Sequence, residues 1–142
     1  MGAVMSSGAI GSTVFIIDDD PDVRHSFGML FQAVGQPVES FATAEAFLET
    51  YDPDRPGCLV VDIHMPGMSG LELQDMLLDK KIRIPIIIMT GQGDVATAVA
   101  TVKKGAIDFL VKPFEEQVLL KRVKQALEVD AQWRQERQGA SE

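Results

Sequence analysis

The stretch Val14-Phe15-Ile16-Ile17-Asp18-Asp19-Asp20-Pro21 is an apolar run that ends abruptly in three acids and a proline. Three further apolar runs, residues 58–61, 84–89 and 107–111, are equally free of strict alternation. Such runs indicate strands buried on both faces, which is typical of parallel strands under helices. A weaker run at residues 37–41 is expected at an edge of the sheet, where its leading proline is tolerated.

Between these runs the apolar spacing becomes that of a helix. The clearest helical face consists of Val23, Phe27, Leu30, Phe31 and Val34, with Pro21 in the first turn and Gly35 at the end. Further helices are expected after Thr43, after Ser69 with Glu72 in a capping box, after Asp94, and from about Glu115. The stripe predicted to be buried after Asp94 is Val95, Ala98, Val99 and Val102, and that of the last helix is Leu120, Val123 and Leu127.

Five strands, each followed by a helix, predict an α/β chain with a parallel sheet and right-handed crossovers. The strand order does not follow from this pattern. At 142 residues the chain fits one domain. The net charge of -8 disfavours direct binding to nucleic-acid backbone, and no apolar stretch is long enough to span a bilayer. Cys58 is the single cysteine, so no internal disulfide is possible and a reducing cytoplasm is expected.

The tails differ in composition from the body of the chain. Residues 1–12 are small and uncharged, as in a disordered leader or cloning remnant, and residues 13–128 form the expected domain. Residues 129–142 carry mixed charges around Val129 and Trp133, which indicates a helical extension or a linker. An exposed Trp133 would point to a missing neighbour, and therefore to an output domain absent from this chain.

Polar residues directly follow four of the predicted strands. They are Asp18, Asp19 and Asp20 after the first, Asp62 after the third, Thr90 after the fourth and Lys112 after the fifth. In open α/β sheets the ligand crevice lies outside the carboxyl ends of the strands, so these residues are expected to converge.

The residue types suit phosphoryl chemistry. Crowded carboxylates repel one another, and a hard divalent ion such as Mg²⁺ relieves that repulsion with oxygen ligands. A lysine and a threonine hydroxyl suit phosphoryl oxygens, and an aspartate can act as the nucleophile. Each piece also has an ordinary explanation: a helix cap for Asp18 to Asp20, a solvated side chain for Lys112 and a turn for Thr90. Their joint arrangement at four strand ends favours the phosphoryl site.

The chain resembles the response-regulator receiver family over residues 13–128. The resemblance is carried by Ile16-Ile17-Asp18-Asp19-Asp20, Val61-Asp62-Ile63-His64-Met65-Pro66-Gly67-Met68-Ser69-Gly70, Met89-Thr90-Gly91 and Phe109-Leu110-Val111-Lys112-Pro113-Phe114. Details such as Gly91-Gln92-Gly93-Asp94-Val95 are similar to the FixJ type, whose members usually carry a LuxR-type helix-turn-helix output domain. The family implies a flavodoxin-like, doubly wound (βα)5 fold with strand order 2-1-3-4-5.

The resemblance also implies roles for individual residues. Asp62 would be the phosphoacceptor, with Thr90 and Lys112 binding the phosphoryl group. Mg²⁺ would be held by Asp19, by Asp18 through water, by Asp62 and by the backbone carbonyl of His64. The Lys112-Pro113 bond would be cis. A sensor histidine kinase would supply the phosphoryl group, so the chain would be a signalling domain rather than an enzyme.

The same resemblance implies a conformational switch and two residues that set the lifetime of the phosphoryl group. Thr90 would move toward the phosphoryl group and Phe109 would repack behind it, changing the surface of the fourth helix, fifth strand and fifth helix and promoting a homodimer there. Plain core packing is the alternative for Phe109. His64 and Gln92 flank the expected route of water and would tune the phosphoryl lifetime, unless they are loop residues without special effect.

Three other functions share features with this pattern. A haloacid-dehalogenase-like phosphatase also uses an aspartate, magnesium, threonine and lysine, but its nucleophile lies in the first acidic motif, whereas here Asp62 follows a later strand. A phosphorylation-independent adaptor would need a broken site. A stand-alone receiver differs from a truncated transcription factor only in having no output domain, and DNA would be bound only through that domain.

Overall fold

The computed structural model describes the backbone of residues 11–141 and the side chains of residues 11–137. Five parallel strands form one sheet in the order β2-β1-β3-β4-β5. The strands are β1 (Thr13–Ile17), β2 (Val38–Phe41), β3 (Gly57–Asp62), β4 (Ile86–Thr90) and β5 (Asp108–Val111). The helices are α1 (Pro21–Ala33), α2 (Ala44–Thr50), α3 (Gly70–Asp79), α4 (Val95–Lys103) and α5 (Glu116–Ser141), with a 3-10 turn η2 (Gln92–Asp94) before α4. The doubly wound fold and its strand order are therefore confirmed.

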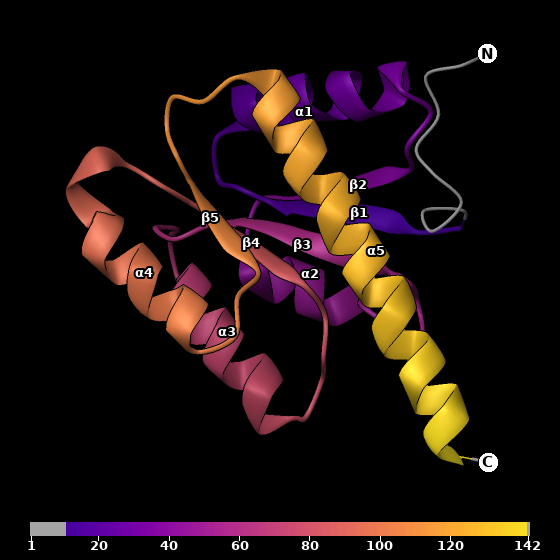
Figure 1. The fold of residues 1–142 in the computed structure, drawn as a ribbon. Helices are drawn as coiled ribbons and strands as arrows, with labels where there is room; N and C mark the ends of the chain where they lie inside the picture. Colours follow the sequence, from indigo (N-terminus) through magenta and orange to yellow (C-terminus); the bar gives the residue numbers. More distant parts are fainter. Residues whose placement is uncertain (1–10, 142) are drawn as a thin grey trace.

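Helices cover both faces of the sheet (Figure 1). Successive strand residues point to opposite faces, so each strand contributes to two cores. One core packs under α2, α3 and α4 and contains Phe15, Ile17, Leu59, Val61, Phe47, Leu73 and Ile88. The other packs under α1 and α5 and contains Val14, Ile16, Val60, Ile87, Phe31, Leu119 and Val123. This double burial explains the non-alternating apolar runs.

The helix starts follow the capping residues in the sequence. The Asp20 side chain accepts from Asp22 N–H with Pro21 in the first turn, and Thr43 caps α2 through Ala46 N–H at 3.0 Å. Ser69 and Glu72 form the predicted capping box of α3. Strand β4 begins after Pro85 rather than at residue 84, because proline has no N–H to donate to the ladder.

Two predicted burial stripes are wrong in part. On α4, Ala98 is buried but Val95 and Val99 are 36% and 38% exposed, and Thr101 is buried in their place. Thr101 is accommodated because its hydroxyl donates to Ala98 O at 2.6 Å and its carbonyl accepts from Gln74. On α5, Leu119 is fully buried and Leu120 only partly, although Val123 and Leu127 are buried as expected.

Helix α5 continues beyond the sheet in one unbroken run (Figure 1). Its second half is fastened to the loop before β3. Asp130, 1% exposed, accepts from Gly57 N–H at 3.0 Å and from Arg134 Nε at 2.8 Å. The Arg134 guanidinium also donates to the carbonyls of Pro53 and Arg55. Trp133 is half-buried against Arg83, whose guanidinium lies 4.0 Å from the indole centroid, so the expectation of an exposed tryptophan is wrong.

Ser12, the last residue of the expected leader, is buried, and its carbonyl accepts from the Gln36 side chain at 2.8 Å. Residues 1–10 of that segment lie outside the described residues. Among the helices of the described part of the chain, none combines the length and apolar character needed to cross a bilayer.

Candidate functional site: an acidic crevice with one lysine

Three aspartates meet where the central strands end. Asp18 and Asp19 directly follow β1, and Asp62 is the last residue of β3, the strand paired with β1. Each offers a carboxylate oxygen, and these oxygens all lie within 4.8 Å of one another. The chain leaves β1 and β3 toward opposite faces of the sheet, so a crevice opens between the two strand ends.

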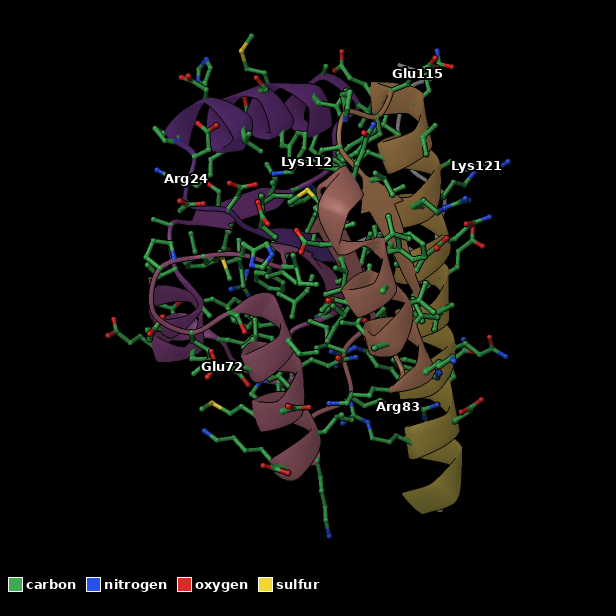
Figure 2. All side chains as sticks on the ribbon, turned by 90° about the vertical axis from the view of Figure 1, so that its left-hand side faces the viewer. Arg24, Glu72, Arg83, Lys112, Glu115 and Lys121 are labelled. Carbon is green, nitrogen blue, oxygen red and sulfur yellow. The ribbon has the colours of Figure 1, made fainter. Side chains whose placement is uncertain are left out.

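Lys112 brings the compensating charge from β5. Its Nζ lies 2.8 Å from Asp62 Oδ2 and 3.1 Å from Asp18 Oδ2. The backbone holds it there, because Lys112 N–H donates to Thr90 O at 2.7 Å and the Lys112-Pro113 bond is cis, as expected. Figure 2 places this side chain beneath α1, at the edge of the sheet where the strands end. Burial opposes the charged form of Lys112, but its hydrogen bonds to Asp62 and Asp18 outweigh this and raise its pKa.

Asp18 is the most enclosed of the three acids, at 1% exposure. Burial raises the pKa of Asp18, although the Asp20 N–H and Lys112 act in the opposite direction. Its Oδ1 accepts from Asp20 N–H at 2.9 Å, and its backbone carbonyl accepts from Arg24 at 2.8 Å. The carboxylate is therefore oriented by its own loop, and the backbone that carries it is held by α1.

Asp62 is oriented by the loop that follows it. Its Oδ1 accepts from His64 N–H at 3.0 Å, which leaves Oδ2 to face Lys112. Position 70, the second glycine of the motif, has no room for a side chain, because a Cβ there would lie 2.7 Å from Asp62 O. Gly70 N–H also donates to Ile63 O at 3.1 Å, so the start of α3 presses directly on the strand that carries the acid.

Thr90 closes the β4 end of the crevice and is fully buried. Its hydroxyl donates to Gly91 O at 3.2 Å, a local bond to the next residue in the chain. Phe109 is half-buried and lies opposite Ile88 in the β4-β5 register, where it packs against the core under α4. The structure thus places the two expected switch residues on neighbouring strands.

The two expected timing residues lie on the loops around the crevice. Gln92 is exposed at the start of η2. His64 Nε2 lies 2.9 Å from Asp94 Oδ2, so a side-chain pair joins the loop after β3 to the start of α4. Asp94 occupies the N-cap position of α4, as predicted, but its side chain makes no cap hydrogen bond and lies against His64 instead. Thirty positions separate the partners, and no local pattern could have revealed the pair.

The surface of α4, β5 and α5 is mixed in character. Val95 and Val99 on α4 and Val118 on α5 are exposed apolar side chains. On the same surface Arg122 Nε of α5 lies 2.7 Å from Asp108 Oδ2 of β5, and this ion pair connects the two elements. This surface adjoins Phe109, the half-buried residue that follows Asp108.

The crevice brings together three carboxylates and one ammonium group, so excess negative charge remains at close quarters. Oxygen ligands of this kind match a hard divalent cation, which takes one or two carboxylates and completes its shell with water or phosphate oxygens. The same Lys112 ammonium can neutralise an oxygen of an entering phosphoryl group. A nucleophilic carboxylate, a cation site and an anion-binding lysine are thereby placed within one hydrogen-bonded cluster.

The family model described as "Response regulator receiver domain" matches residues 14–124. The chain belongs to this family. Receiver domains of response regulators act in signalling rather than as enzymes in the usual sense, and the acidic cluster is consistent with the phosphorylation site of such a domain.

Individual relatives agree with this assignment. The chain is 44% identical over 122 residues to nodulation protein W of Bradyrhizobium diazoefficiens, covering 86% of this chain and 54% of the relative. It is 47% identical over 117 residues to the transcriptional regulatory protein FixJ of Rhizobium meliloti, covering 82% and 57% respectively. The chain therefore spans about half the length of these curated relatives.

Solved receiver structures match the fold closely. The response regulator StyR superposes with a TM-score of 0.88 at 46% identity, over 92% of this chain and 66% of that one. The crystal structure of FixJ-N gives a TM-score of 0.77 at 45% identity, over 82% of this chain and 94% of that one. Because the family model matches, the acidic crevice is interpreted as the site of a receiver domain and not as that of a haloacid-dehalogenase-like phosphatase.

Proposed function

We propose that Asp62 accepts a phosphoryl group from a sensor histidine kinase and that this changes the surface used to control an output domain. The observation that carries the proposal is the cluster of Lys112 with Asp62 and Asp18, at 2.8 and 3.1 Å, at the ends of the strands. A carboxylate oxygen of Asp62 attacks phosphorus as the bond to the donor nitrogen breaks. The product is an acyl phosphate on Asp62, and Lys112 pairs with one of its peripheral oxygens.

The three acids fit Mg²⁺, since one ammonium group cannot balance three carboxylates whose oxygens lie within 4.8 Å. Asp19 and Asp62 would bind it directly, Asp18 through water, and the His64 carbonyl would complete the protein ligands. When bound, the ion lowers the charge repulsion between the carboxylates and the incoming phosphoryl group. The protein contributes the orientation of Asp62 by His64 N–H and of Asp18 by Asp20 N–H.

The switch runs from Thr90 to Phe109 in this proposal. A phosphoryl oxygen offers Thr90 a charged acceptor that is stronger than its present bond to Gly91 O, and the hydroxyl turns toward it. Phe109 on the neighbouring strand repacks into the space that is left. The exposed Val95, Val99 and Val118 of the α4-β5-α5 surface then form a homodimer interface in the phosphorylated protein.

Residues 13–128 would be the receiver domain, and residues 129–142 the helical connection to a DNA-binding output domain. Support comes from FixJ, which is named a transcriptional regulatory protein, and from the length of FixJ and of nodulation protein W, which are about twice as long as the matched region. DNA would be bound only by that further domain, because this chain has a net charge of -8. A cytoplasmic location is consistent with the single buried, unpaired Cys58.

The phosphorylation step is tested by incubating the protein with Mg²⁺ and acetyl phosphate and measuring intact mass. One added phosphoryl group, labile to hydroxylamine as an acyl phosphate is, is expected for wild type. Asp62→Asn should gain none, while Asp75→Asn, on the exposed side of α3, serves as the matched control. A folded, Mg²⁺-replete wild-type protein that remains unmodified with every small donor and with histidine kinases would contradict the proposal.

His64 and Gln92 set the lifetime of the acyl phosphate in this proposal, because they stand at the mouth of the crevice. The His64–Asp94 pair restrains the loop over the site. His64→Ala and Gln92→Ala should each change the rate of phosphoryl loss, followed by intact mass after removal of the donor. Unchanged rates in both variants would refute this role.

A further inference from the structure

A second cavity lies at the opposite end of the sheet from the acidic crevice. It has a volume of about 440 Å³, is open to solvent on one side, and is bordered by the end of α3, the loop before β4, the loop after α4 and the second half of α5. Its apolar wall includes Leu77, Ile82, Ile84 and the indole of Trp133. This size and composition fall in the range of small-molecule sites.

The charged residues that line this cavity are all basic. Lys81, Arg83 and Lys104 contribute to its wall, and among the described lining residues none is an aspartate or glutamate. The contrast is large for a chain with 21 acidic and 13 basic residues. Lys104 and Arg83 each pair with an acid outside the cavity, Asp75 at 3.1 Å and Glu136 at 3.8 Å, but these pairs are exposed and weak.

Lys81 has a backbone conformation that is unusual for a residue with a side chain. It adopts φ 58°, and within residues 11–141 it is the one residue other than glycine with a positive φ. This position follows the end of α3, where glycine is the usual choice because it avoids the steric cost of the left-handed conformation. Lys81 also makes no ion pair with any described side chain.

The cavity also has an unsatisfied polar group in its wall. Gln74 is 2% exposed, and its Nε2 donates to Thr101 O at 2.9 Å, while its Oε1 has no hydrogen-bond partner. A buried amide oxygen left without a donor is costly, so such groups in folded proteins usually have a partner. Gln74 Oε1 is itself closed to solvent, so a hydroxyl or N–H donor of a ligand would reach it only after the Gln74 side chain rotates toward the cavity.

The α5 side of the cavity is held in place by contacts already in the fold. Arg83 stacks on Trp133, and Figure 2 shows the labelled Arg83 beside the second half of α5. One turn away, Asp130 and Arg134 fasten the same helix to the loop before β3. The wall that carries Trp133 is therefore preorganised, which lowers the entropic cost of binding.

We infer that this cavity is a binding site for a small organic anion with an aromatic or other compact apolar body and a hydrogen-bond donor. Its carboxylate would lie among Lys81, Arg83 and Lys104, its body against Ile82, Ile84 and Trp133, and its donor toward Gln74. The inference does not depend on phosphorylation, since Asp62 lies at the other end of β3.

The test is a titration of the ¹⁵N-labelled full chain with 6-hydroxy-2-naphthoate, followed by NMR. Trp133 is the single tryptophan, so its indole N–H gives one assignable peak. We expect a saturable shift of that peak and of the Lys81 and Lys104 amides, with binding about tenfold weaker for the neutral 6-hydroxy-2-naphthamide because three charges are involved. Equal binding of acid and amide, or saturable shifts confined to the region of Lys112, would overturn the anion site.

Neighbouring lysines provide matched controls. Lys81→Ala and Lys104→Ala should each weaken binding of the naphthoate about twofold to fivefold, the range of an exposed ion pair. Lys80→Ala and Lys103→Ala, at adjacent exposed positions that do not line the cavity, should leave it unchanged. If the Lys80 and Lys103 variants lost as much affinity as the Lys81 and Lys104 variants, the binding would be nonspecific charge attraction, and the proposal would be overturned.

The donor is tested with a second ligand. In wild type, 6-hydroxy-2-naphthoate should bind more tightly than 2-naphthoate, and Gln74→Met should abolish this difference if the variant retains the wild-type fold by NMR. A hydroxyl preference that persists in Gln74→Met would remove Gln74 from the site. Absence of any saturable shift at millimolar 6-hydroxy-2-naphthoate in wild type would refute the site as a whole.

Discussion

Lys112 Nζ lies 2.8 Å from Asp62 Oδ2, so the residue after β5 is bonded across β4 to the last residue of β3. Asp18 shares the same ammonium group at 3.1 Å. The lysine therefore has two tasks: it compensates the acids in the free protein, and it is available to a phosphoryl oxygen when one arrives. Substitution of Lys112 therefore tests both roles, one by the rate of phosphorylation and the other by stability.

We predict that Lys112→Met slows phosphorylation by acetyl phosphate about 100-fold, because an electrostatic partner of the transferring group is lost. Without a divalent cation the variant should also be less stable than wild type by about 1 kcal/mol, since the acids lose their counter-charge. Added Mg²⁺ should recover most of that stability. The measurements are intact mass against time and thermal unfolding in EDTA or Mg²⁺, and a stability gap that Mg²⁺ leaves unchanged would count against a cation at the three acids.

Thr90→Ala should accept the phosphoryl group at close to the wild-type level and yet dimerise less. The variant loses the hydroxyl that would turn from Gly91 O, but it keeps Asp62 and Lys112. Light scattering after gel filtration in beryllofluoride and Mg²⁺ measures the dimer. Thr50→Ala, on α2, is the control and should behave as wild type. Full dimerisation of phosphorylated Thr90→Ala would refute the relay to Phe109.

Tyr51 should make stability fall at high pH. It stacks on Phe47 with 4.7 Å between ring centroids, and burial raises its pKa from 10.0 to about 12. The folded state thus holds the phenolic proton more tightly than the unfolded state, so this contribution is complete below pH 10 and is lost as the pH rises toward 12. The lost stability is about 1 to 2 kcal/mol, allowing for part exposure.

Urea unfolding between pH 9 and 12 measures this loss, with Tyr51→Phe as the reference that cannot ionise. Tyr51 is the single tyrosine, so absorbance at 295 nm follows its phenolate directly. Wild type should lose stability relative to Tyr51→Phe only above about pH 10. Parallel profiles for the two proteins would contradict the raised pKa.

Asp130→Ala should be among the more damaging substitutions on α5, at about 2 to 4 kcal/mol. It leaves Gly57 N–H and the Arg134 guanidinium without their shared acceptor in a buried place. Arg137→Ala, an exposed position on the same helix, is the control and should change stability by less than about 0.5 kcal/mol. Equal effects in chemical unfolding would mean that the second half of α5 is not fastened by Asp130.

Two glycines should respond in opposite ways to alanine. A Cβ on Gly57 would lie 2.1 Å from Thr13 O, within the β1-β3 pair, so Gly57→Ala should unfold the chain or destabilise it severely. Gly28 lies inside α1 with nothing within 4 Å of an added Cβ, and Gly28→Ala should stabilise by about 0.5 to 1 kcal/mol. Thermal unfolding of both variants checks the pair, and a well-folded Gly57→Ala would contradict the close approach.

The sheet could be predicted because strands buried on both faces leave continuous apolar runs, and because Thr43, Ser69 and Gly35 mark helix ends locally. The convergence of Asp18, Asp62 and Lys112 followed from the topology of parallel strands. The order of the strands could be predicted only from the family resemblance, because the apolar pattern does not show which strands are neighbours.

Burial on the helices was less predictable, because it depends on partners distant in sequence. Thr101 is buried because Gln74 of another helix donates to its carbonyl, while the more apolar Val95 and Val99 face outward. Asp94 reads as a cap but pairs with His64. Asp130 looks like one charge in a polar tail, and only the fold places it against Gly57, 73 positions earlier.

Strand β3 has the proposed phosphoacceptor at one end and the Gly57–Asp130 bond at the other. Helix α5 has 26 residues and is fixed near its middle, so a small tilt at the point of attachment produces a larger displacement at its C-terminal end. The direction in which α5 leaves the domain thus depends on one buried acid that is remote from the chemistry, together with Arg134 and the Arg83–Trp133 contact. Relatives that differ at the Gly57–Asp130 contact would carry out the same reaction and yet hold the segment after the helix in a different orientation.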